Sequence, residues 1–397
     1  MRFTLNYPSR VRLDFLIGGA LLLLFLQLVS GTLQVYAELI FLFIVLSGIT
    51  VNLLGGLNSI SGFCVAAMSL KIVVISQIAK VFLWQPADQR LETPLETAAV
   101  LLAGMAGMCL AAALTAPVRF RKHILSTAVD SESLRALSIV LTLIGLVVTF
   151  GITVLGGGGD GVLQVGGVVG VLRQFSFCLS FAIGVGTAYT IVGSNGKRLF
   201  SIFNAVPFFI SFIFGVLYAS KEGMFGPFLY LALAACAFNF AIRGIHLACL
   251  LAFVLTATFI FYPFAQLARS EVRGYGFKDT IGESGRFIGE HFGSLSGFQD
   301  MLAAEANSPP EQDFYNYYRK PLGLFERLSL IKMVDLLTSS TLQEGTSGWE
   351  TVIHGFKMMV PRAIYPQKPV WNTGQLLAHK AGMLAEDDES TQVSFGF

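Results

Sequence analysis

Nine long apolar runs fill the first two thirds of the chain, and they restrict its fold more than any other feature. Each is close to the roughly 20 residues that an α-helix needs to cross the hydrocarbon core of a bilayer. A spanning segment must pair all its backbone polar groups internally, which a helix does. We therefore predict an all-α polytopic membrane protein with about nine transmembrane helices. The runs are 15–30, 37–57, 62–84, 97–116, 134–155, 175–192, 199–218, 224–242 and 246–267.

Charge is distributed unevenly and divides the chain in two. Only 13% of all residues are charged, about half the usual share in soluble domains, near 25%. Residues 1–267 hold 24 charged side chains, whereas residues 268–397 hold 28. We therefore predict a transmembrane domain over 1–267 and a largely helical extramembrane segment over 268–397. The net charge of +2 gives no indication of a nucleic-acid partner.

The cations between the runs predict the orientation. With the N-terminus in the cytoplasm, the inside loops carry 10 Lys and Arg residues and the outside loops carry 4. Lys and Arg concentrate on the cytoplasmic side of membrane proteins. After nine crossings, the segment 268–397 is then expected on the outer, periplasmic side of the membrane.

Few motifs of soluble enzymes or metal sites are present. All five cysteines lie in apolar runs, so neither a disulfide framework nor a CxxC metal site is expected. The sequence has no Walker loop, no GxSxG and no HExxH. We predict neither a metal nor a cofactor.

Cations within or beside the apolar runs suggest function, because ionisable groups in a bilayer are costly. Lys71 lies midway along the third run and is either functional or without a functional role. Lys80 on the same run is expected to extend to the outer interface. Arg173 opens the sixth run, where it serves either as an interfacial anchor or as a contact for phosphate or sugar.

Helix-like and aromatic stretches lie in the middle of the extramembrane segment, after a Gly- and charge-rich start over 269–290. Residues 321–341 show an apolar helical pattern, with Lys332 and Asp335 off the apolar face, and a second helix is expected over 350–359. Four aromatic residues precede them, and either form an interfacial belt or stack on sugar rings. They are Phe314, Tyr315, Tyr317 and Tyr318.

A proline-rich stretch follows the second helix. Residues 361–369 contain three prolines, which exclude regular helix and favour a stiff, extended path. Such a path holds Arg362 and Lys368 in position, either to bind an anion or merely as solvated cations on a rigid linker.

Residues 325–374 resemble the bacterial oligosaccharide repeat-unit polymerases, the Wzy-type O-antigen and exopolysaccharide polymerases. The matching features are Glu326-Arg327-Leu328-Ser329, then Gly345 and Trp349, then the run Val360-Pro361-Arg362-Ala363-Ile364-Tyr365-Pro366-Gln367-Lys368-Pro369. The family frequently has tryptophan at the position of Tyr365 and an acid or Asn at that of Gln367. The resemblance covers about an eighth of the chain.

The resemblance implies a GT-C-like architecture and a metal-independent glycosyltransferase of the bacterial inner membrane. Such an enzyme joins oligosaccharide units carried on undecaprenyl diphosphate, for O-antigen (lipopolysaccharide) or exopolysaccharide, with a chain-length regulator protein as a further partner. The diphosphate leaving group requires cations. The expected catalytic residues are Arg362, Arg327 and His354 as a base. The expected substrate contacts are Lys368, Arg173, Arg286, Tyr365 and Glu326, the last also the alternative base.

Two other functions stay open, and only the first has a similar architecture. An O-antigen ligase takes the same lipid-linked donor but transfers it to the lipid A core, and a flippase or exporter moves polysaccharide without catalysis. In the polymerase family further helices normally follow the long loop, so we expect either a truncated chain or a variant without its last helices.

Overall fold

The computed structural model describes most of the helical part of the chain and selected portions of the remainder. The described residues are 2–4, 8–115, 130–155, 171–172, 174–217, 220–238, 240–256, 260, 282, 285–286, 289–290, 297, 317–319, 329–346, 348–349, 353, 355–357, 360, 365 and 379. The chain forms two compact units, which we describe separately. Unit 1 comprises residues 1–7 and 122–309, and unit 2 comprises residues 8–121 and 310–397.

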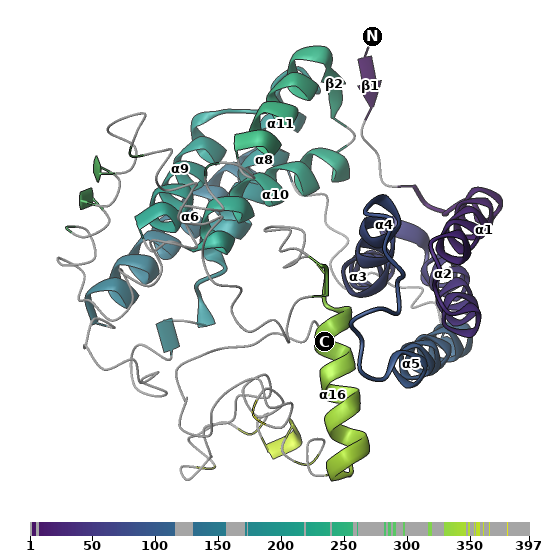
Figure 1. The fold of residues 1–397 in the computed structure, drawn as a ribbon. Helices are drawn as coiled ribbons and strands as arrows, with labels where there is room; N and C mark the ends of the chain where they lie inside the picture. The colour runs from purple at the N-terminus through teal and green to yellow at the C-terminus, as the bar shows by residue number, and fades with distance from the viewer. Residues whose placement is uncertain are drawn as a thin grey trace. The chain divides into compact units, whose positions relative to one another are not determined.

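Unit 2 contains the first helices of the chain (Figure 1). It also contains helix α16, which belongs to residues 268–397, called the polar segment from here on. Helix α2 packs against α1, α3 and α5. Helices α3 and α4 are joined by the π-helical turn η2, so that they form one helical stretch from Ile60 to Phe82. The elements are α1 (Leu13–Val29), α2 (Gln34–Leu53), η1 (Gly56–Asn58), α3 (Ile60–Ser69), η2 (Leu70–Val74), α4 (Ile75–Phe82), α5 (Pro94–Thr115) and α16 (Ile331–Glu344).

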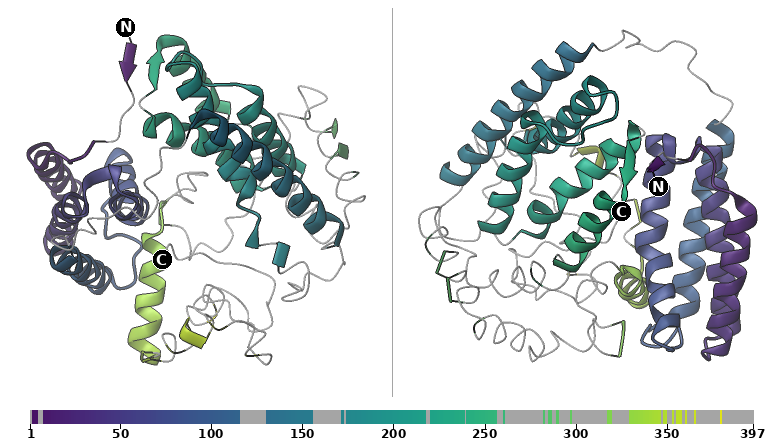
Figure 2. Two further views of the ribbon diagram at one scale, coloured as in Figure 1. Left: turned by 180° about the vertical axis from the view of Figure 1, so that it is seen from behind. Right: turned by 90° about the horizontal axis from the view of Figure 1, so that it is seen from above.

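Helix α16 lies across the other helices of unit 2. Figure 1 views α1 to α5 nearly along their axes and α16 from the side, and the right-hand view of Figure 2 reverses this. Helix α16 packs on α5, and its buried side chains belong to the same apolar core as those of α2 and α5. That core includes Tyr36, Ile40, Phe43, Val73, Met105, Tyr317, Tyr318, Ile331 and Val334.

The described part of unit 1 contains helices α6, α8, α9, α10 and α11 and one short pair of strands. Helix α8 packs against α6, α9 and α10, and T-shaped ring contacts join Phe208 of α9 to Phe228 of α10. The strands pair antiparallel with Arg2 opposite Arg243. The elements are β1 (Arg2–Thr4), α6 (Ser131–Leu155), α8 (Cys178–Gly193), α9 (Ile202–Leu217), α10 (Lys221–Ala237), β2 (Ala241–Arg243) and α11 (Gly244–Thr256).

The helices confirm the all-α membrane fold in its coarser form. Each of the nine predicted runs contains a described helix. Among the residues that the structure describes, four stretches are long and apolar enough to cross a membrane: Gln34–Leu53, Ile60–Phe82, Pro94–Thr115 and Ser131–Ile152. Nine crossings and a GT-C-like architecture stay predictions, as does the division of the chain at residue 268. The pairing of β1 with β2 was not predicted.

Close packing of helices in unit 1 depends on Gly186 of α8. A Cβ atom there would lie 2.6 Å from the Phe203 carbonyl oxygen and 2.9 Å from Ser138 Oγ, on α9 and α6. Gly184 lies on the same helix, and a Cβ atom there would meet nothing within 4 Å. Small residues permit this kind of close approach between membrane helices.

We predict that Gly186→Ala destabilises the protein by about 1–3 kcal/mol, the usual cost of overpacking. Gly184→Ala is the matched control, and it should not lower the stability of the protein. Thermal unfolding of both variants in the same detergent measures the difference. Equal melting temperatures would show that α6, α8 and α9 do not meet at Gly186.

Candidate functional site

The loop between α4 and α5, residues 83–93, is where the polar segment contacts the membrane helices of unit 2. Both Trp84 and Arg90 have positive φ angles, 54° and 72°, in the left-handed region that is unfavourable for side chains with a Cβ. Such conformations cost about 1–3 kcal/mol each and persist where surrounding contacts hold them. Contacts from residues 317–319 and from α16 hold this loop, together with hydrogen bonds to Thr32 and Lys80.

Lys80, near the end of α4, is completely buried. Its ammonium group donates a hydrogen bond to the Gln89 carbonyl (3.0 Å) and lies 4.2 Å from the centre of the Tyr317 ring. A carbonyl oxygen and an aromatic face both stabilise a cation removed from water. The ammonium group of Lys80 thus reaches the loop that follows α4, where the chain near residue 317 covers it. That this loop lies at the outer membrane interface stays a prediction.

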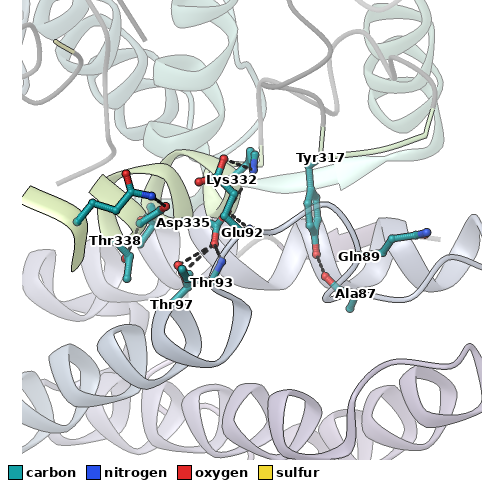
Figure 3. A network of polar contacts seen from close by, with 12 residues as sticks. Ala87, Gln89, Glu92, Thr93, Thr97, Tyr317, Lys332, Asp335 and Thr338 are labelled. Carbon is teal, nitrogen blue, oxygen red and sulfur yellow. Dashed lines mark hydrogen bonds and ion pairs between the residues drawn. The ribbon is translucent and has the colours of Figure 1, made fainter. Parts of the chain in front are cut away.

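Tyr317 and Tyr318 are buried side chains of unit 2, so neither belongs to an exposed interfacial belt. The Tyr317 hydroxyl donates to the Ala87 carbonyl (Figure 3). It also accepts a hydrogen bond from Gln77 Nε2 at 3.4 Å. Burial raises the pKa of the Tyr317 phenol well above its ordinary value. Phe314 and Tyr315 lie outside the described residues.

Three cations gather around these tyrosines. The Arg90 guanidinium donates to the Tyr318 carbonyl (3.1 Å), and that of Arg319 donates to Gln89 Oε1 (3.3 Å). The charge of Lys80 is repelled by both arginines and attracted by Asp88. We call Lys80, Arg90 and Arg319 the cation cluster. Because two of its members belong to the α4–α5 region and one to the polar segment, their association depends on the contact between them.

A second polar contact joins α16 to the start of α5. The Asp335 carboxylate is fully buried and accepts hydrogen bonds from the backbone NH groups of Glu92 (2.8 Å) and Thr93 (2.9 Å), as Figure 3 shows. It also accepts from Thr97 Oγ1 at 3.1 Å. A carboxylate at a helix N-terminus satisfies backbone donors and interacts favourably with the helix dipole.

Lys332 neutralises this carboxylate. Its ammonium group lies 3.2 Å from Asp335 and 3.7 Å from Glu92, and its side chain is almost entirely buried. The sequence pattern placed Lys332 and Asp335 off the apolar face of their helix, and both are nevertheless buried. They are buried because α5 and its preceding loop supply partners for both charges.

The start of α16 reaches the π-helical turn of the third membrane run. The Leu330 NH group donates to the Lys71 carbonyl at 3.4 Å. Lys71 itself is half-buried. π-helical turns within α-helices occur frequently at functional sites, and here the turn meets the segment just before α16.

The structure describes only two of the residues that the sequence predicts for the site. Arg286 belongs to unit 1, is exposed and forms an ion pair with Glu290 at 3.8 Å. Tyr365 belongs to unit 2 and is half-buried. The other predicted residues lie outside the described part of the chain. They are Arg362, Arg327, His354, Lys368, Arg173 and Glu326.

The described residues also bear on metal binding and on the predicted helices. Among them, no three His, Cys, Asp or Glu side chains gather as a metal site, and the prediction of a metal-independent site stays a prediction.

The expected helix over 321–341 corresponds to α16, which begins at Ile331 and ends at Glu344. Within the expected helix 350–359, residues 353 and 355–357 are helical.

Sequence reasoning missed the cation cluster and the role of Asp335. One local signal existed for the latter: Thr93-Pro94-Leu95-Glu96 is typical of a helix start. Nothing local indicated that the acceptor for the preceding NH groups lies more than 240 residues away. No family model, no curated protein and no solved structure matches this chain.

We predict that Asp335→Ala destabilises unit 2 by about 3–5 kcal/mol, because it leaves Lys332 buried without its closest partner. Replacing Lys332 by Met in the same chain should recover part of this loss. Glu344→Ala, at the exposed end of the same helix, is the control and should change stability little. Thermal unfolding in detergent gives the comparison. If the Asp335 and Glu344 variants melted together, Asp335 would not hold α16 to α5.

The raised pKa of Tyr317 gives a prediction at high pH. The phenol ionises near pH 10 in the unfolded chain but at a higher pH in the folded protein, because burial disfavours the charged form. Above about pH 10 the unfolded state therefore binds fewer protons than the folded state, and the free energy of unfolding falls as the pH rises. In Tyr317→Phe this contribution is absent, so stability measured across that range should fall less steeply than in the original chain. Identical slopes would contradict the burial of Tyr317.

Proposed function

We propose that this chain is a membrane-embedded glycosyltransferase that polymerises oligosaccharide repeat units carried on undecaprenyl diphosphate, at the periplasmic face of a bacterial inner membrane. The observation that carries the proposal is the cation cluster, in which Arg319 of the polar segment meets Lys80 and Arg90 of the α4–α5 region. A lipid-linked substrate presents its phosphates at the membrane surface, where such a cluster can attract them. The positive-inside count supports an outer position for this loop.

The resemblance at residues 325–374 supports the choice of reaction. In the proposed reaction, a hydroxyl of the incoming unit attacks the anomeric carbon of the growing chain. The bond from that carbon to the diphosphate oxygen breaks, and the hydroxyl proton passes to a base. Undecaprenyl diphosphate leaves with the electron pair of the broken bond, and its negative charge increases as it departs.

Arg362 and Arg327 are proposed to stabilise this leaving group. Arginine is permanently charged and can bind two phosphate oxygens in a bidentate arrangement. His354 is the proposed base, with Glu326 as the alternative. Lys368, Arg173, Arg286 and Tyr365 are proposed substrate contacts.

Arg319 adds a residue that the motif alone did not indicate. Its guanidinium is hydrogen-bonded to Gln89, yet the residue remains exposed, so it can reach a ligand at the surface. Its backbone NH is held by Gln85 Oε1 at 3.3 Å. We therefore propose that Arg319 receives the phosphates of the lipid-linked substrate.

We predict that Arg319→Ala and Arg362→Ala each remove the polymer ladder from a deletion strain complemented with this chain. Lys380→Ala is the control: it removes a cation from the same segment outside both the cluster and the proline-rich motif. It should leave the ladder unchanged. Arg362→Lys should fail if a bidentate contact is needed and partly succeed if charge alone suffices. Glycan gels check the ladder, and immunoblots of membranes check that each variant is present.

The same strains distinguish the two other functions. Polymer that accumulates on its lipid carrier without reaching lipid A would indicate a ligase. Repeat units retained on the cytoplasmic side would indicate a flippase or exporter. A normal ladder in both arginine variants would contradict the proposed roles.

A further inference from the structure

Large apolar side chains remain exposed on the last turn of α16 and on the part of the polar segment that follows it. Trp349 is 76% exposed, Phe356 68%, Leu342 60% and Ile353 50%. Burying a side chain of this kind gains about 1.5–3 kcal/mol. Four such exposed side chains within 15 residues would therefore gain from contact with an apolar partner surface.

Three of these side chains, Trp349, Ile353 and Phe356, are spaced by four and three positions in the sequence. Ile353 and Phe356 are helical, and the Ile353 NH group donates to the Trp349 carbonyl at 2.9 Å. Residues spaced by three or four positions lie on the same side of a helix. Lys357 is exposed next to Phe356. The stretch thus combines an apolar face with a cation beside it, as in helices that lie in a membrane surface.

The position of this stretch in the fold indicates which partner covers it. Trp349 follows the end of α16 by five residues, and Asp335 and Lys332 hold α16 against the start of α5. Helix α16 lies across the membrane helices rather than along them (Figures 1 and 2). The segment is therefore tethered where a helix that is long and apolar enough to cross the membrane begins.

Two further exposed aromatic residues lie at the C-terminal end of α4 and in the loop that follows it. Phe82 is 86% exposed and Trp84 62%, and both adjoin the loop that contacts the polar segment. Tryptophan concentrates at the level of the lipid headgroups. The bilayer boundary is thus expected at this end of unit 2, close to the start of α5.

We propose that Leu342, Trp349, Ile353 and Phe356 insert into the outer leaflet of the bilayer, with Lys357 among the lipid phosphates. The polar segment is then fixed to the membrane at two places: by α16 on α5, and by this apolar surface in lipid. The proposal concerns the lipid surface alone and does not depend on the reaction proposed above.

Fluorescence of Trp349 tests this proposal in the full chain. The protein has three tryptophans, so Trp84→Phe with Trp371→Phe leaves only Trp349. The variant is reconstituted into vesicles of phosphatidylethanolamine and phosphatidylglycerol whose acyl chains are either normal or brominated. Brominated chains should quench Trp349 as strongly as they quench Trp84 in the matching variant that retains only that tryptophan. Quenching by aqueous iodide, without quenching by bromine, would show that the face lies in water.

A pair of substitutions on the single-tryptophan background makes the test specific to the apolar face. Phe356→Asp places a charge on this face and should reduce quenching by brominated chains. Gly355→Ser changes the neighbouring position, where an added Cβ meets nothing within 4 Å, and should leave quenching unchanged. Protection of Trp349 from both bromine and iodide would overturn the proposal and indicate instead that a protein covers this surface.

Discussion

The buried Asp335 carboxylate is the contact on which the arrangement of unit 2 depends. It accepts hydrogen bonds from the backbone immediately before α5 and is neutralised by Lys332 on its own helix. Removing a charge from water is costly unless it is both paired and hydrogen-bonded, and here both conditions are met. The contact joins a late, polar part of the chain to one of its first membrane helices, and so brings Tyr317 and Arg319 to the α4–α5 loop.

A feature of the fold or of the site could be predicted from the sequence where the interactions that form it are local in the chain. The described helices of the nine apolar runs follow from the sequence, because length and hydropathy act within each run. Helix α16 was also indicated by its apolar pattern, although it begins ten residues later than the pattern. The burial of Lys80 and Asp335 was not predictable from their neighbours. Gln89 and Lys332 are close to them in the sequence, but Tyr317 and Thr93, which complete their surroundings, lie more than 230 residues away. Arg362 and the other motif residues lie outside the described part of the chain, so their roles rest on the resemblance.

The cation cluster gives the proposed function a physical basis beyond that resemblance. Lys80 is held beneath Tyr317, while Arg319 is exposed above the same loop. A buried cation raises the positive potential at a surface site without itself reaching the ligand. One buried cation and one exposed cation suit a diphosphate group that must be attracted, held during bond breaking and then released with its lipid. The proposed insertion of Trp349 and Phe356 into lipid would keep the polar segment at the depth of that headgroup.

Reconstitution with a purified substrate tests the central claim most directly. The chain is placed in vesicles that contain only an undecaprenyl-diphosphate-linked repeat unit, and the products are separated by size. The account predicts glycans of two or more units, together with release of one undecaprenyl diphosphate for each linkage formed. Repeat units that cross the bilayer unchanged, or that are transferred only when lipid A core is supplied, would contradict it.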